Sequence, residues 1–131
     1  VGDRGTTFCS PATSFCAAVA ADRAAKDKRF VYQRKLMDGG MCESSAYCEL
    51  GYDATGMCVA LGNYHNRNIS TGKLAPEYVD LNDYALLVKW FIALVETKRR
   101  YTGRDTRIGE QLTRLRREYE PLLRRTVLSA G

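Results

Sequence analysis

The single histidine of the chain, His65, is the residue best suited to metal or proton chemistry in this sequence. It follows an apolar run, Thr55 to Leu61, and Asn63 and Tyr64 stand directly before it in a turn-forming loop. Because open α/β sheets hold their sites at the carboxyl ends of strands, this position predicts an imidazole presented to a site. Asn63 and Tyr64 could orient its ring. In the alternative, His65 satisfies a hydrogen bond of its own loop, and its neighbours only form the turn.

A glycine pair and an acidic residue lie upstream of this histidine. Gly39 and Gly40 break one apolar segment, and Glu43 follows them at the start of a short segment rich in small residues. Glycine allows a backbone to approach a site closely, so this turn and Glu43 predict contacts with a substrate or with metal ligands. Two alternatives stay open. The turn itself can require glycine, and an acid is favoured at a helix start by the helix dipole.

The order of these residues resembles the C-terminal part of co-catalytic zinc aminopeptidases, in the zinc-peptidase clan with the phosphorylase/hydrolase-like fold. The resemblance extends from about Val1 to Leu94. The residues that carry it are Gly39-Gly40 with Glu43, Gly51-Tyr52-Asp53-Ala54-Thr55-Gly56, and Asn63-Tyr64-His65-Asn66. In that family a Gly-Gly-Thr-acid turn precedes a helix, and the next strand delivers the last metal-binding histidine. Met41 departs from this pattern, because the family usually has threonine there.

The resemblance implies two zinc ions, a peptide substrate, and His65 as the terminal ligand of one metal ion. Two zinc ions would polarise the scissile carbonyl and lower the pKa of a bridging water. Gly40, Glu43, Asn63 and Tyr64 are expected to contact substrate or support the ligand. The family's other ligands, a histidine, a bridging Asp and a Glu-Glu pair, would precede this segment, and the chain has no second histidine. The prediction is therefore the C-terminal part of an aminopeptidase-like zinc metallohydrolase that is inactive alone, with no catalytic residue assigned.

The competing prediction is a non-catalytic interaction module with a basic docking helix. Residues 98–125 hold ten Lys or Arg against four Asp or Glu, whereas the rest of the chain is nearly neutral. Apolar residues recur there at steps of four and three, which predicts one stripe on an amphipathic helix. They are Ile108, Leu112, Leu115, Tyr119 and Leu122. This pattern favours docking to a protein or homo-oligomerisation. Nucleic-acid binding is the lesser alternative, because few aromatic residues are interleaved for base stacking.

Composition limits the class of protein. With 131 residues, 45% hydrophobic and 27% charged, the chain fits one globular domain. It has no apolar run of eighteen residues and no basic-then-apolar leader, so neither a membrane span nor a signal peptide is expected. Its five cysteines include no Cys-x-x-Cys pair, which indicates reduced thiols in a cytoplasmic protein. The first residue is not Met, which predicts that the sequence is part of a longer protein.

The predicted fold class is α/β, a partial phosphorylase/hydrolase-like three-layer sheet with flanking helices and an added basic helix. The sequence divides into residues 1–97, the zinc-peptidase-like part, and 98–131, the helical extension. Helices are predicted from Ser10 to about Lys28 and over 42–50, ended by Gly51. Strands are predicted at Arg29 to Leu36 and Thr55 to Leu61.

The next helix is predicted to begin at Asp80, whose side chain can cap it. Trp90 is expected at the edge of an inward apolar stripe. That stripe consists of Tyr84, Leu87, Val88, Phe91 and Leu94. Gly103 is expected to separate this helix from the basic one, which Pro121 should kink or end.

Overall fold

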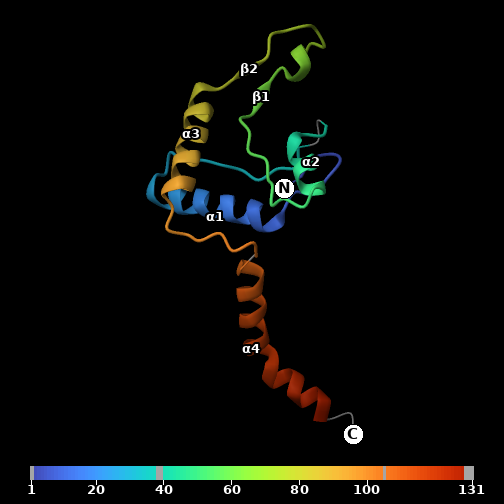
Figure 1. The fold of residues 1–131 in the computed structure, drawn as a ribbon, viewed down its shortest axis with the longest axis vertical. Coiled ribbons are helices and arrows are strands. Elements are labelled where there is room, and N and C mark those ends of the chain that lie inside the picture. The colour runs from blue at the N-terminus through green and yellow to red at the C-terminus, as the bar shows by residue number, and fades with distance from the viewer. Residues whose placement is uncertain (1, 38–39, 105, 129–131) are drawn as a thin grey trace.

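The computed structural model describes residues 2–37, 40–104 and 106–128, in which helices predominate (Figure 1). The helices are α1 (Ser10–Lys26), α2 (Glu43–Glu49), α3 (Leu81–Glu96) and α4 (Thr106–Leu128), with a 3-10 turn at Tyr64–Asn66. The short strands β1 (Leu61–Gly62) and β2 (Tyr78–Val79) pair antiparallel, with Leu61 opposite Val79. The prediction of mixed α and β structure is confirmed at this coarse level.

Local signals place the helix ends close to their predicted positions. The Asp80 carboxylate accepts hydrogen bonds from the backbone N–H groups of Asn82 and Asp83, at 2.7 and 3.3 Å, and caps α3. Gly51, two residues after the end of α2, has a φ of 85°, and Gly103, between α3 and α4, has a φ of 67°. Both values lie in the left-handed region that glycine tolerates. These ends depend on neighbouring residues only, which makes them readable from the sequence.

Helices α1 and α3 pack together and bury the small core. The inward face of α1 consists largely of small residues, and Phe8 and Phe30 supply the large buried side chains. From α3 the Trp90 indole Nε1 donates a hydrogen bond to the Cys16 carbonyl oxygen at 3.1 Å. Its ring also packs edge-on against Phe30, with the centroids 6.4 Å apart. Because α1 offers little side-chain volume, the largest side chain of α3 fills the space between the two helices.

The predicted inward stripe of α3 is therefore partly wrong. Tyr84, Val88 and Phe91 are 54%, 41% and 51% exposed, whereas Leu87, Trp90 and Leu94 are half-buried. Helix α3 is apolar on opposite faces, so its periodicity alone cannot say which face turns inward. Packing against α1 selects the Trp90 face and leaves the other in water.

The two predicted strands are extended segments that lack a sheet. Of the range Thr55 to Leu61, only Leu61 belongs to a strand, and Arg29 to Leu36 contains none. In Figure 1 both segments run through the body as extended coil. A strand needs a hydrogen-bonded neighbour, and residues 31–36 and 55–60 make no backbone–backbone hydrogen bond to any described residue. These strand predictions are corrected accordingly.

Helix α4 extends away from the rest of the molecule (Figure 1). Pro121 lies within it, and the helix continues to Leu128 with a bend along its length (Figure 1). Of the two predicted outcomes, an end at Pro121 is therefore wrong, and the bend agrees with a kink. Leu112, Tyr119 and Leu122 are 60%, 49% and 57% exposed. Three of the five residues of the predicted apolar stripe are thus exposed, whereas Leu115 is half-buried. The side chain of Ile108 lies outside the described part. No helix in the described ranges has the length and apolar character needed to cross a membrane.

Candidate functional site

His65 lies in the loop that connects β1 to β2, and its side chain is exposed. Its backbone N–H donates to the Glu77 carboxylate at 2.7 Å. The Tyr64 and His65 rings lie against each other with centroids 4.0 Å apart. The Asn63 side-chain amide donates to the Pro76 carbonyl oxygen at 2.9 Å. The loop is thus fastened across its base, and its histidine ring is presented to solvent beside Tyr64.

This loop also contains a cluster of unusual backbone conformations. Asn63, His65 and Asn66 have φ values of 53°, 57° and 56°, in the left-handed region that non-glycine residues rarely adopt. Asn and His tolerate this region better than β-branched residues do, but it still carries strain. Such conformations persist only where the surroundings impose them, and they concentrate at functional sites.

The turn at Gly40 and the helix that begins at Glu43 belong to a second cluster, built around Asp3. The Arg4 N–H donates to the Gly40 carbonyl oxygen at 3.2 Å. The Asp3 carboxylate accepts from the Cys42 N–H at 2.9 Å and from the Ser45 hydroxyl, which fastens the start of α2 to the N-terminal segment. Glu43 is the first residue of α2 and is exposed. Gly39 lies outside the described residues.

Asp3 was not among the residues predicted to matter, although a signal for it exists. Its carboxylate also accepts from the N–H groups of Gly5 and Thr6, both at 2.9 Å. An Asp two residues before Gly is a common sequence for such a turn. The Ser45 hydrogen bond, followed by those of the three backbone N–H groups, holds the pKa of Asp3 well below its ordinary value, and burial opposes this shift only partly.

A third cluster surrounds Asp53, which lies in the segment that resembles the aminopeptidases. Tyr101 donates to one carboxylate oxygen at 2.5 Å, and the Cys9 thiol donates to the other at 3.2 Å. The Tyr101 and Cys9 bonds lower the pKa of Asp53. Burial and the Asp53 bond raise the pKa of Tyr101. These bonds tie together the segment around Tyr101, the start of α1 and Asp53.

The structure therefore divides the predicted site residues between two clusters. Asn63, Tyr64 and His65 share the β1–β2 loop, and Gly40 and Glu43 lie at the turn held by Asp3. Among the described residues, no hydrogen bond or ring contact joins His65 to Gly40 or Glu43. Nor does any group of three His, Cys, Asp or Glu side chains converge in that part of the chain. One imidazole does not fit a zinc site, which needs three or more protein ligands.

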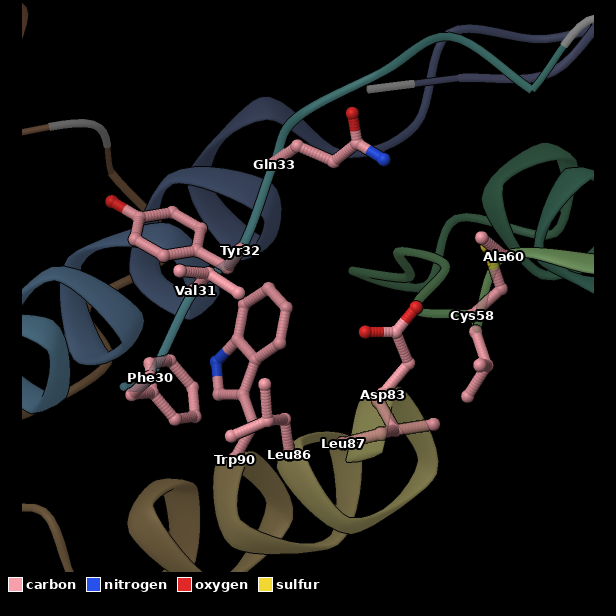
Figure 2. Close-up of a pocket in the computed structure, with 11 residues that line it drawn as sticks. Phe30, Val31, Tyr32, Gln33, Cys58, Ala60, Asp83, Leu86, Leu87 and Trp90 are labelled. Atoms are coloured by element: carbon pink, nitrogen blue, oxygen red, sulfur yellow. The ribbon is translucent and has the colours of Figure 1, made fainter. Parts of the chain in front are cut away.

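A cavity of about 280 Å³ lies over the inward face of α3 (Figure 2). The segments Phe30–Gln33 and Cys58–Ala60 form its two sides, and α3 forms its floor with Asp83, Leu86, Leu87 and Trp90. In Figure 2 the Trp90 ring rises between the two sides toward Tyr32, with the Tyr32 and Trp90 centroids 5.7 Å apart. The sequence analysis did not predict this cavity, because it assigned both Arg29 to Leu36 and Thr55 to Leu61 to strands of a sheet.

Comparison of the chain with protein-family models, curated proteins and solved structures gave no match. Functional proposals for this chain therefore depend on its own residues and their geometry.

Proposed function

We propose that this chain is part of an aminopeptidase-like zinc metallohydrolase, to which it contributes His65 as one terminal metal ligand. The observation that carries the proposal is the presentation of the chain's sole imidazole on an exposed, strained loop. Asn63 fastens this loop to Pro76, and the Tyr64 ring lies against the imidazole. Both contacts suit a role in orienting a ligand.

In this proposal the remaining metal ligands, including the acidic ones, belong to protein outside the described residues. The described residues alone do not fit a complete zinc site, so the chain by itself is expected to lack peptidase activity. A bound zinc pair would supply an activated water for peptide hydrolysis. Gly40 and Glu43 would contact peptide substrate from the turn that Asp3 holds.

The finer fold assignment, a phosphorylase/hydrolase-like three-layer sheet, is also part of the proposal. The extended segments 31–36 and 55–60 would be strands of that larger sheet, which agrees with their unpaired backbones. A cytoplasmic location is proposed because all five cysteines are free thiols, as is usual in a reducing compartment.

The direct test is the reading frame upstream of the Val1 codon. We expect it to encode a His-x-Asp motif and a Glu-Glu pair in the same frame. A start codon immediately before Val1 would contradict the proposal.

The isolated chain gives a second test, because its one histidine produces a single set of imidazole NMR signals. Titration with Zn²⁺ should shift the His65 ring signals weakly, at millimolar metal, and small peptide amides should not be hydrolysed. Zinc-dependent hydrolysis that His65→Ala abolishes would show instead that the chain holds a complete site.

A second candidate function, an interaction module that docks through α4, is favoured by a different observation. Leu112, Tyr119 and Leu122 lie exposed on one side of this helix, while Arg114 and Arg117 share another side, around a shallow cavity with Gly109 and Thr113. A second copy of the chain is the simplest partner for such a stripe.

Sedimentation velocity tests this partner. We expect a dimer whose dissociation constant rises at least about tenfold in Leu112→Glu, because one buried leucine is worth roughly 1.5–3 kcal/mol. Thr113→Glu, on the same helix, is the matched control.

A further inference from the structure

We infer that the cavity of Figure 2 is a strand slot, which accepts an extended peptide with apolar residues at alternate positions. Its sides are Phe30–Gln33 and Cys58–Ala60, and its floor is α3. The peptide is supplied by protein outside these 131 residues. The inference does not depend on His65 or on zinc, because neither takes part in the slot.

The unpaired backbones along both sides are the first argument. Hydrogen bonds fasten the ends of these segments: Phe30 N–H to the Asp27 oxygen at 2.9 Å, Met37 N–H to the Gly2 oxygen at 3.0 Å, and Cys9 N–H to the Ala54 oxygen at 3.0 Å. Between these anchors, residues 31–36 and 55–60 make no backbone–backbone hydrogen bond to any described residue. Such rows of free N–H and C=O groups are templates for an added strand.

The apolar floor is the second argument. Leu86, Leu87 and Trp90 turn toward the gap from α3 and are half-buried. A strand points alternate side chains to opposite faces. One set of side chains from an inserted strand would therefore cover this floor, as sheets and helices pack in layered folds. The other set would face away from α3.

The free backbone groups, and not the volume, distinguish a peptide from a small molecule as the occupant. At about 280 Å³ the cavity is close to the lower end of the roughly 300–1,000 Å³ of most small-molecule pockets. Its free backbone groups extend beyond the cavity in both flanking segments, over six residues in each. Only a polypeptide backbone repeats donors and acceptors with the period that these segments require.

The experiment uses one synthetic probe, the fluorescein-labelled peptide acetyl-Lys-Val-Thr-Val-Thr-Val-Thr-Lys-amide, with hydrogen exchange and fluorescence anisotropy as the readouts. On binding, alternate amides within residues 31–36 and within residues 55–60 should become protected together. Protection of one segment alone would mean addition at a free edge, and absence of protection would mean no strand binding; either result overturns the slot. Concentration-dependent protection without peptide would identify a second copy as the occupant, contrary to the inference.

Proline substitution tests the backbone role directly. Neighbouring residues of an extended segment direct their N–H groups to opposite sides, so either Gln33 or Arg34 faces the slot. One of the variants Gln33→Pro and Arg34→Pro should weaken peptide binding about fivefold or more, the value of one hydrogen bond. The other variant, with Gln33→Ala and Arg34→Ala as matched controls, should stay within about twofold. Since no described hydrogen bond is lost in the free chain, all four variants should fold. Equal binding by both proline variants and the controls would overturn the inference.

The same probe separates this inference from the proposed zinc role. His65→Ala should leave the anisotropy titration unchanged, whereas the proline variants should leave the zinc-induced shift of the His65 signals unchanged. The strand slot and the zinc role can therefore be contradicted independently of each other.

Discussion

The Trp90 indole and the Cys16 carbonyl group, 74 positions apart in the chain, are joined by a hydrogen bond of 3.1 Å. This bond fixes the register of α3 on α1 and gives α3 an inner and an outer apolar face. The inner face forms the floor of the strand slot. The outer face exposes Tyr84, Val88 and Phe91 to solvent. A contiguous apolar surface of this kind is typical of an interaction site.

Two substitutions of Trp90 should destabilise the chain to different extents. Trp90→Phe loses the hydrogen bond and part of the ring, and should lower the free energy of unfolding by about 1–2 kcal/mol. Trp90→Ala should lower it by about 3–5 kcal/mol. Urea unfolding should be followed by circular dichroism, because Trp90 is the only tryptophan. Val95→Ala, on the exposed face of α3, should change the value by less than about 0.5 kcal/mol. A similar loss in Val95→Ala would argue against the inward orientation of Trp90.

Asp3 should make stability depend on pH in the acid range. Because its folded-state pKa is lowered, its contribution is present above the pKa of an unfolded Asp, about 4, and is lost as the pH falls toward the folded value. The difference in unfolding free energy between the wild type and Asp3→Asn should thus be largest above about pH 4 and shrink below it. Urea unfolding at a series of pH values measures this difference. Ser45→Ala removes the main cause of the shift and should move the loss to higher pH; a pH-independent difference would contradict the assignment.

Replacement of His65 by glycine should relieve the strain of its left-handed backbone. We expect His65→Gly to raise the free energy of unfolding by about 0.5–1 kcal/mol relative to His65→Ala, because only glycine adopts a φ of 57° freely. Both variants lose the imidazole, so the comparison isolates the effect of the left-handed backbone on the free energy of unfolding. Chemical denaturation of the two variants side by side provides the measurement. Equal stabilities would mean that the loop relaxes and that its conformation is not imposed.

The bond between Tyr101 and Asp53 should protect the segment that joins α3 to α4. Tyr101 also packs edge-on against Phe15, with the ring centroids 5.5 Å apart, so Tyr101→Phe removes only the hydroxyl. Trypsin should then cleave faster at Arg100 and Arg104, by about fivefold if the lost hydrogen bond is worth roughly 1 kcal/mol. Mass spectrometry of timed digests locates the cuts. Tyr119→Phe, on α4, is the control and should cleave at the wild-type rate; unchanged cleavage of Tyr101→Phe would show that its hydroxyl does not hold the segment.

Much of the helical structure was readable from the sequence because its signals are local. Asp80 caps α3 by bonding to N–H groups two and three residues away, and Gly51 and Gly103 tolerate the left-handed backbone beyond a helix end. The composition likewise identified His65 as the only imidazole and α4 as a basic amphipathic helix. Each of these properties belongs to a residue and its close neighbours.

Tertiary structure decided what depends on distant segments. Apolar periodicity suited either face of α3, and the small side chains of α1 selected the one with Trp90. Asp3 acquired its role only when Cys42 and Ser45, about forty residues away, came within hydrogen-bonding distance. The segment 31–36 has the alternation of a strand and 55–60 has the apolar run of a buried one, yet neither pairs with any described residue, because a strand forms only beside another strand. A sequence determines which segments can pair, whereas pairing itself requires a partner in space.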